Sequence, residues 1–466
     1  MKVSGFTSVV AALALSIGSQ AIQAQQPEVS PSTPLESVVP SLVKTSAEYN
    51  LFNSHASTCD SCGSTGACCD TGCLSGGGFS LQDMLCGDDS FAAIYGWTQL
   101  GYHSESTGLF NTHPDGLRLH QQWLGMKREA DGSCGVDYGF GVDLLYGYDA
   151  ADTQAFGGEA GSWDTQWNHG STGWALPQVY GEIAAGDWSV RAGHFYTLVG
   201  YEVVQAPDNF FYSHAFTQYT IEPFTHTGAY ATYSGIENVT VYGGWTAGWD
   251  TGFNQFDSFP ESDGSNFLGG ISLELTEAMT LTYITTFGDF GQAAGVPFAS
   301  DGTAMFAGVP VAAGLTASPA DGYEHSLVLS YDASDDLTFV LQSDYLGLYD
   351  INFRDAMGTS VATGQREAFS LNGYAFYTIN DTLAFGQRLE WLHLRDEARM
   401  NGMYLSSLSS SNQEFYEYTA GLNIKLHENV MLRPEYRYQW ATNEVNPFIG
   451  GNMNASSFGM DMVLTY

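Results

Sequence analysis

Basic residues are scarce in this chain of 466 residues. It holds 14 Lys and Arg against 51 Asp and Glu, which gives a formal net charge of −37 at pH 7. Proteins that bind nucleic acid need a basic face, so this balance excludes most of them. Charged residues of both signs make up only 14% of the chain, against roughly 25% in ordinary soluble domains.

Long apolar runs are also missing after the first residues. Beyond residue 24 no segment approaches the ~20 apolar residues of a membrane-spanning helix. Residues 1–24 place Lys2 before an apolar run from Val9 to Ile17, and small residues follow up to Ala24. This order is typical of a secretory signal peptide. We therefore expect an exported protein without a helical anchor.

Cysteine is confined almost entirely to one stretch. Residues 25–45 are rich in Pro, Ser, Gln and Val, which is typical of a linker, and six of the seven Cys follow before residue 90. Export favours disulfides. The Cys spacing matches no common zinc pattern, so neither a metal nor another cofactor is expected. Cys134 is expected to pair with one of the others, because it opens a strand segment on the same side of the membrane. The disulfide candidates are Cys59, Cys62, Cys68, Cys69, Cys73, Cys86 and Cys134.

Aromatic residues and glycine are abundant, and apolar residues recur with period two. Aromatics make up 14% of the chain, and Gly occupies 54 positions. From Val136 to Tyr148 apolar residues alternate with small or acidic ones, as in a strand with two different faces. About 16 such segments, most of roughly ten to thirteen residues, resemble membrane-crossing strands, which need about 9 to 11 residues. They lie at 91–103, 117–126, 135–149, 174–185, 188–197, 225–234, 238–249, 266–275, 279–289, 323–332, 336–347, 367–378, 382–394, 415–426, 430–441 and 457–466.

The connections between these segments alternate in length. His427–Asn429 is short, for example, whereas 150–173 and 290–322 are long. Short turns on one side and long loops on the other are typical of an up-and-down membrane barrel. Backbone polar groups in lipid must all be paired, which requires closure. We therefore predict an all-β fold: a transmembrane, antiparallel up-and-down β-barrel of about 16 strands over 91–466. A Cys-rich periplasmic extension at 25–90 precedes it, and both termini lie in the periplasm.

Three stretches of the barrel region are distinctive. They read RAGHFYTLVGYEVVQAPDNFFYSHAF at 191–216, EPFTHTGAYATY at 222–233 and NGYAFYTINDTLAFGQRLEWL at 372–392. Through them the region from about 91 to 466 resembles the OmpL-like porin family named "putative beta-barrel porin-2". The resemblance implies an outer-membrane diffusion porin and supplies no enzymatic residues. It does not cover the Cys-rich segment.

The polar face of the strands is expected to line the lumen if the apolar face meets lipid. A 16-stranded barrel encloses water, so charged residues are tolerated there. Basic residues gather between Arg388 and Arg437, which makes one wall locally positive in an acidic protein. The predicted pore-lining residues are Asp137, Asp143, Glu182, Arg191, Glu274, Asp344, Arg388, Glu390, Glu417, Lys425, Arg433, Glu435 and Arg437.

The third long loop, residues 198–224, is the predicted constriction. The third loop of general porins commonly folds inward, and we expect the same here by analogy. Its acidic residues are then expected to face Arg433 and Arg437 and to set up a transverse field. An ordinary surface loop is the alternative. The predicted constriction residues are Glu202, Asp208 and Glu222.

The predicted function is passive diffusion of small hydrophilic solutes and ions through an outer-membrane porin. Acidic outer loops concentrate cations at the mouth, so weak cation selectivity is expected. Expected partners are outer-membrane lipid and, by analogy with other 16-stranded porins, a homotrimer. A non-conducting barrel that binds ligands or serves a structural role is the alternative. It would need a filled lumen, whereas Gly139, Gly141, Gly386 and Gly421 on the inner face indicate room.

No enzymatic activity is expected. An outer-membrane hydrolase would need a Ser/His or Asp/His site at the rim of the barrel. His103, His113, His214, His226 and His393 stand isolated, without a recognisable Ser or Asp motif.

Overall fold

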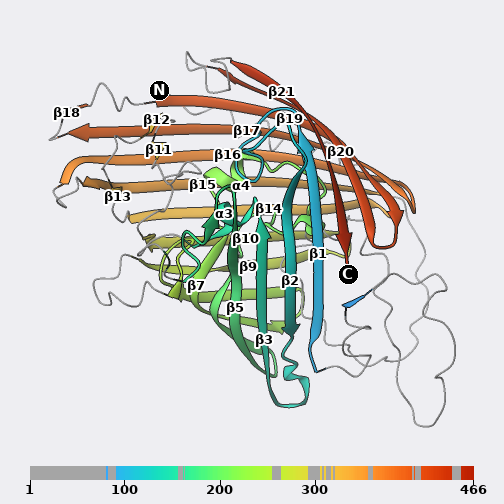
Figure 1. The fold of residues 1–466 in the computed structure, drawn as a ribbon. Helices are drawn as coiled ribbons and strands as arrows, with labels where there is room; N and C mark the ends of the chain where they lie inside the picture. Colours follow the sequence, from blue (N-terminus) through green and yellow to red (C-terminus); the bar gives the residue numbers. More distant parts are fainter. Residues whose placement is uncertain are drawn as a thin grey trace, which may run out of the picture. The chain divides into compact units, whose positions relative to one another are not determined.

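Sixteen strands form a closed antiparallel barrel in the computed structural model (Figure 1). This confirms the predicted fold class. The model describes residues 80–81, 91–155, 161, 163–253, 264–291, 305–306, 309–310, 316–317, 321–354, 360–400, 403–404, 411–442 and 453–466. The barrel strands are β1 (Ala93–His103), β2 (Arg118–Arg128), β3 (Val136–Gly147), β5 (Thr172–Ala185), β6 (Trp188–Tyr196), β7 (Thr225–Ile236), β8 (Val239–Thr246), β9 (Ser265–Thr276), β10 (Met279–Asp289), β14 (Asp321–Ser334), β15 (Leu337–Arg354), β16 (Ser360–Asn380), β17 (Leu383–Met400), β19 (Ser411–His427), β20 (Val430–Thr442) and β21 (Asn454–Thr465).

Short elements complete the described part of the chain. Among the described residues no helix is long and apolar enough to cross a membrane. The helical turns are η3 (Gly132–Cys134), α3 (Ala150–Thr153), η4 (Ala206–Asp208) and α4 (Phe216–Thr220). The short strands are β4 (Asn168–His169), β11 (Met305–Phe306), β12 (Val309–Pro310), β13 (Thr316–Ala317) and β18 (Met403–Tyr404).

The first and last barrel strands close the ring. Each barrel strand pairs with its neighbour along the chain, and β1 also pairs with β21, from Trp97 opposite Thr465 to His103 opposite Gly459 (Figure 1). Beyond this ladder Gly96 and Tyr466 exchange two backbone hydrogen bonds of 2.9 Å. Closure leaves no edge strand with unpaired backbone groups.

All sixteen predicted segments coincide with barrel strands. Four strands, β15, β16, β17 and β19, extend furthest beyond the predicted segments, and β16 reaches 21 residues. The extra length lies at the end of the barrel with the long connections, which we call the loop end; the opposite end is the turn end. Alternation fades there in the sequence, but backbone pairing continues, for instance between Arg366 and Asp396.

The predicted amino-terminal segments are outside the described residues. This holds for the signal peptide at 1–24, for all of 25–90 except residues 80–81, and for six of the seven Cys. The seventh, Cys134, is exposed in η3 before β3. Its disulfide therefore stays a prediction.

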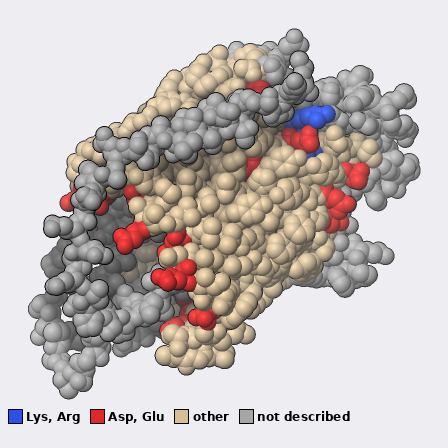
Figure 2. All heavy atoms as spheres, turned by 180° about the vertical axis from the view of Figure 1, so that it is seen from behind, with Lys and Arg blue, Asp and Glu red and all other residues tan. Residues whose placement is uncertain are grey.

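The two faces of each strand differ as the alternation predicts. On β20, Met431, Arg433 and Glu435 point inward and are buried, whereas Tyr436 and Tyr438 point outward and are exposed. Figure 2 shows one side of the molecule, on which charged residues gather toward opposite edges and leave a broad area almost free of them. An uncharged band between charged edges suits a surface in contact with lipid.

Candidate functional site

The connection between β6 and β7 runs through the interior of the barrel. We call residues 197–224 the lumen loop. Its Tyr201, Phe210 and Phe211 are buried in one apolar cluster with inward side chains of the wall, among them Tyr374 and Phe376. Burying these rings gives the loop a hydrophobic seat. The predicted inward course of this loop is therefore what the structure has.

Arginines of the wall bind the backbone of the lumen loop. Arg433 donates to the carbonyl oxygens of Ala206 at 2.7 Å and Asn209 at 2.6 Å. Arg437 donates to the carbonyl of His214 at 2.5 Å. Charge-assisted hydrogen bonds of this kind are stronger than neutral ones, so these side chains hold the loop in place.

Carboxylates of the same wall accept hydrogen bonds from backbone N–H groups of the loop. Glu435 accepts hydrogen bonds from the backbone N–H groups of Tyr212 at 2.9 Å and Ser213 at 3.1 Å. Glu390 accepts from the N–H groups of Phe216 and Thr217, both at 2.7 Å. The wall therefore pairs both N–H and C=O groups of a buried, irregular segment. Without these partners the groups would stay unpaired, because burial removes their hydrogen bonds to water.

One ion pair ties the loop to the wall by side chains. Arg388 on β17 donates to Glu202 of the loop at 2.6 Å and to Glu417 on β19 at 2.8 Å. Arg388 also donates to the carbonyl of Ser213 at 2.8 Å. Arg388 and Glu417 are fully buried, so removing the charge of Arg388 would take the closest cation away from two buried carboxylates at once.

Glycines on the inner face make room for the loop. A side chain at Gly386 would collide with the ring of Phe210, and one at Gly421 would press on the ring of Phe211. Both glycines were expected to leave space in the lumen. The structure fills that space with loop aromatics, because a wall position without a Cβ lets a ring lie against the strand backbone.

The predicted site residues fall into three groups. A first group is buried in the wall: Asp344, Arg388, Glu390, Glu417, Arg433, Glu435 and Arg437. A second faces the interior from β3, β5 and β6: Asp143, Glu182 and Arg191. A third lies toward the turn end: Asp137, Glu274 and Lys425.

The three acidic residues of the loop do not contact the two arginines that the sequence suggested. Glu202 pairs with Arg388, and Glu222 accepts a hydrogen bond from Gln342 at 2.5 Å. Asp208 lies near Lys127 and Asp143. Arg433 pairs with Asp461, and Arg437 binds His214 and Gln439.

The sequence identified Asp143 as an inward residue but missed its polar partners, which lie on β1, β5 and β6 and form a second wall of the interior. Asp143 accepts hydrogen bonds from Tyr95 at 2.6 Å, Gln178 at 2.8 Å and Tyr196 at 3.1 Å. Tyr95 and Gln178 are half-buried. The inward parity of these positions could have identified them, but tyrosines on strands are also common as outer-face residues.

Three basic side chains near this second wall are paired with an acid. Arg191 contacts Glu182 at 2.7 Å and lies 4.1 Å above the ring of Tyr180. Arg128 pairs with Asp137 at 2.9 Å, and Lys127 with Glu129 at 3.3 Å. Their positive charges are therefore offset locally.

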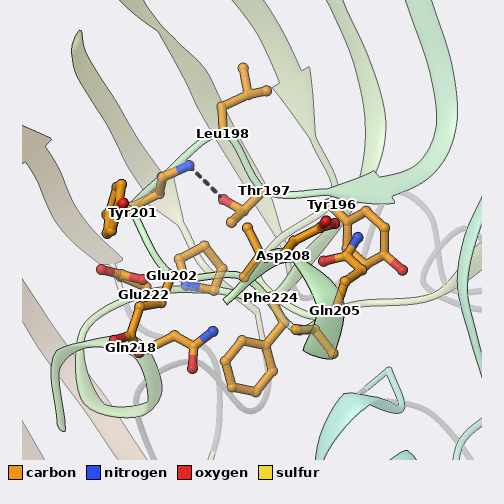
Figure 3. A pocket seen from close by; sticks show the side chains of 15 residues that line it. Tyr196, Thr197, Leu198, Tyr201, Glu202, Gln205, Asp208, Gln218, Glu222 and Phe224 are labelled. Atoms are coloured by element: carbon orange, nitrogen blue, oxygen red, sulfur yellow. Dashed lines mark hydrogen bonds between the residues drawn. The ribbon is translucent and has the colours of Figure 1, made fainter. Parts of the chain in front are cut away.

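Two cavities adjoin the lumen loop. One of about 200 Å³ lies within the loop and is shown in Figure 3. Another of about 530 Å³ lies at the loop end, where Phe216, Tyr219 and Phe415 line it. Across the described ranges, no three His, Cys, Asp or Glu side chains are placed to hold a metal ion.

The seating of the loop is expected to depend on pH through Glu222. Burial and the charges of Asp344, Glu202 and Glu324 raise the pKa of Glu222 well above its usual value. Protonated Glu222 therefore stabilises the seated loop fully below the ordinary Glu pKa of ~4.3. This stabilisation is lost as pH rises from there through the raised pKa of Glu222. Single-channel recordings from pH 4.5 to pH 8 should show more frequent current transitions as pH rises. The Glu222→Gln variant should show a shallower profile, and an equally steep profile in that variant would contradict the assignment.

Comparison with known proteins gives one family match and several structural neighbours. The family model "Putative beta-barrel porin-2, OmpL-like" matches residues 92–466. No curated protein matches the sequence. A loop L8 deletion mutant of OmpT, an outer membrane protein of Vibrio cholerae, has a TM-score of 0.49 at 11% identity, over 80% of this chain and 99% of that one.

Two further solved structures are similar at the same level. OmpF of Salmonella typhi in complex with daunomycin has a TM-score of 0.48 at 10% identity, over 80% of this chain and 97% of that one. An anion-selective porin from Comamonas acidovorans has a TM-score of 0.47 at 10% identity, over 80% and 99%. The family match, which spans the whole described barrel, shows that the chain belongs to the OmpL-like family "Putative beta-barrel porin-2".

Proposed function

We propose that the protein is an outer-membrane porin through which small hydrophilic solutes and ions diffuse passively. The observation that carries the proposal is that the polar anchors of the lumen loop leave part of the wall uncovered. These anchors lie on β2, β15, β17, β19 and β20, while β5 keeps half-buried polar side chains such as Gln178 and Tyr180. A 16-stranded barrel is wide enough to leave a water-filled path beside such a loop.

Weak cation selectivity follows from how the positive charges are used. Arg388, Arg433 and Arg437 are buried beneath the loop, and Lys127, Arg128 and Arg191 are each paired with a carboxylate. The large acidic excess of the chain, −37 in formal charge, is then left to set the potential near the pore. A negative potential raises the local concentration of cations.

The proposed function also implies a location and an orientation for the barrel. The barrel lies in the bacterial outer membrane with lipid as its surroundings, the turn end and both termini in the periplasm, and the loop end outside. A homotrimer is proposed by analogy with other 16-stranded porins. We also propose that residues 1–24 are a signal peptide and that residues 25–90 form a periplasmic extension.

No catalytic role is proposed. His120 contacts Asp149 at 2.8 Å and the hydroxyl of Tyr212 at 2.7 Å, which is an Asp/His arrangement of the kind that a hydrolase uses. All three side chains are buried, and Tyr212 belongs to the lumen loop. This arrangement therefore supports the loop and presents no nucleophile to a substrate.

A liposome-swelling assay tests the diffusion proposal. Proteoliposomes should swell in neutral sugars and amino acids, with rates that fall as the solute becomes larger. Folding is checked by the difference in gel mobility between heated and unheated protein. Absence of swelling from correctly folded barrel would contradict the proposal and favour the non-conducting binding or structural barrel.

A further inference from the structure

The cavity within the lumen loop has mostly apolar walls. Its volume is about 200 Å³, far above the ~10–15 Å³ that one water molecule needs. Tyr196, Leu198 and Phe224 contribute to its walls (Figure 3). Val204 lines it as well. A cavity of this size and character suits a small organic molecule more than a chain of waters.

Three carboxyl groups line the same cavity. Two of them, those of Glu222 and Asp208, have no ion pair among the described residues that corresponds to the pair between Glu202 and Arg388. Glu202 is neutralised by Arg388 at 2.6 Å. The partner of Glu222 is the neutral amide of Gln342, and the nearby Asp344 and Glu324 add further negative charge. Asp208 stands on the other side of the view in Figure 3, beside Tyr196 and Gln205. The cavity therefore has an excess of acid.

Gln218 supplies an independent sign of a missing ligand. Its side chain is 2% exposed, lines the cavity, and has no hydrogen-bond partner for either its amide nitrogen or its amide oxygen. Figure 3 shows it extending toward the same space as Glu222. A buried amide without partners costs free energy unless a ligand completes it.

We propose that this cavity binds a small organic ammonium ion. The ammonium group donates hydrogen bonds to the carboxylate of Glu222 and to the amide oxygen of Gln218, and the alkyl part packs against the apolar walls. Aromatic rings such as those of Tyr196 and Phe224 also attract a cation through cation–π interaction. An inorganic metal ion fits less well, because the described residues place no three acidic, His or Cys ligands around one point.

The chemistry also predicts how binding depends on pH. Burial and neighbouring carboxylates raise the pKa of Glu222, and burial raises that of Asp208 to about 6. The ammonium ion and the proton therefore compete for Glu222. Binding should strengthen with rising pH and release a proton, as long as the amine itself stays protonated. The proposal does not depend on conduction through the barrel.

Isothermal titration calorimetry on the full-length protein in detergent tests the site. The probes are n-butylammonium chloride, the neutral isostere butan-1-ol, and sodium chloride at the same ionic strength. We expect saturable binding of n-butylammonium and none of the other two, with an affinity that rises from pH 6 to pH 8. Saturable binding of sodium, or no binding of any probe, would overturn the proposal.

Variants separate a specific site from loss of structure. Glu222→Gln and Gln218→Leu should each weaken binding of n-butylammonium at least tenfold, while the exposed turn variant Glu237→Gln should bind as the unmodified protein does. Each variant is first checked for the heat-dependent gel shift of a folded barrel. Unchanged affinity in folded Gln218→Leu and Glu222→Gln would contradict the assignment.

Discussion

Replacing Arg388 by Met should detach the lumen loop from the barrel wall and raise single-channel conductance. The substitution keeps an unbranched apolar stem but leaves Glu202 and Glu417 buried without their closest cationic partner. Breaking a buried ion pair from one side typically costs about 3–5 kcal/mol. We expect larger and noisier current steps and a lower temperature for the loss of the folded gel mobility.

A second arginine on the same strand provides the control. Arg395 pairs with Glu367 at 3.1 Å, but their side chains are 47% and 34% exposed. Exposed pairs contribute about 0–1 kcal/mol, so Arg395→Met should leave conductance and stability nearly unchanged. Equal effects of the two substitutions would show that Arg388 has no special part in holding the loop.

Replacing Gly386 by Val should have a similarly large effect by steric means. A side chain at this position collides with the ring of Phe210. This ring belongs to the buried cluster between the lumen loop and the wall. Overpacking a closed site typically costs about 1–3 kcal/mol, and displacing this ring also weakens the neighbouring loop contacts. We expect conductance to change and the thermal stability of the barrel to fall.

Gly373 on the adjacent strand gives the matched comparison for this substitution. It points outward, and the nearest atom to an added Cβ would be 3.7 Å away on Leu341. Val favours strands more than Gly does, so Gly373→Val should be neutral or stabilising. If Gly373→Val and Gly386→Val behaved alike, the effect would belong to the strand backbone and the proposed contact with Phe210 would have no importance.

The strands and their faces could be predicted from the sequence because one rule governs them. Alternation with period two places Arg433, Glu435 and Arg437 on one side of β20 whatever the rest of the barrel does. Closure then follows from the need to pair every backbone group. The inward course of the lumen loop was expected by analogy and is present in the structure.

The partners of the inward residues could not be predicted in the same way. Glu202 and Arg388 are 186 positions apart, and their meeting depends on how deep the loop runs and how the strands are staggered. Arg433 binds backbone carbonyls, which carry no sequence signal at all. The inner glycines were informative about space, but their neighbours decide whether water or a Phe ring fills it.

The reversal potential in a salt gradient tests most directly whether the protein is an open, weakly cation-selective porin. Detergent-purified protein is inserted in a planar bilayer with KCl at higher concentration on one side. We predict stable conductance steps and a reversal potential with the sign for cation permeation, because the wall arginines are occupied by the lumen loop. Stable steps with the opposite sign would contradict the charge assignment. No steps from correctly folded barrel would contradict the porin itself.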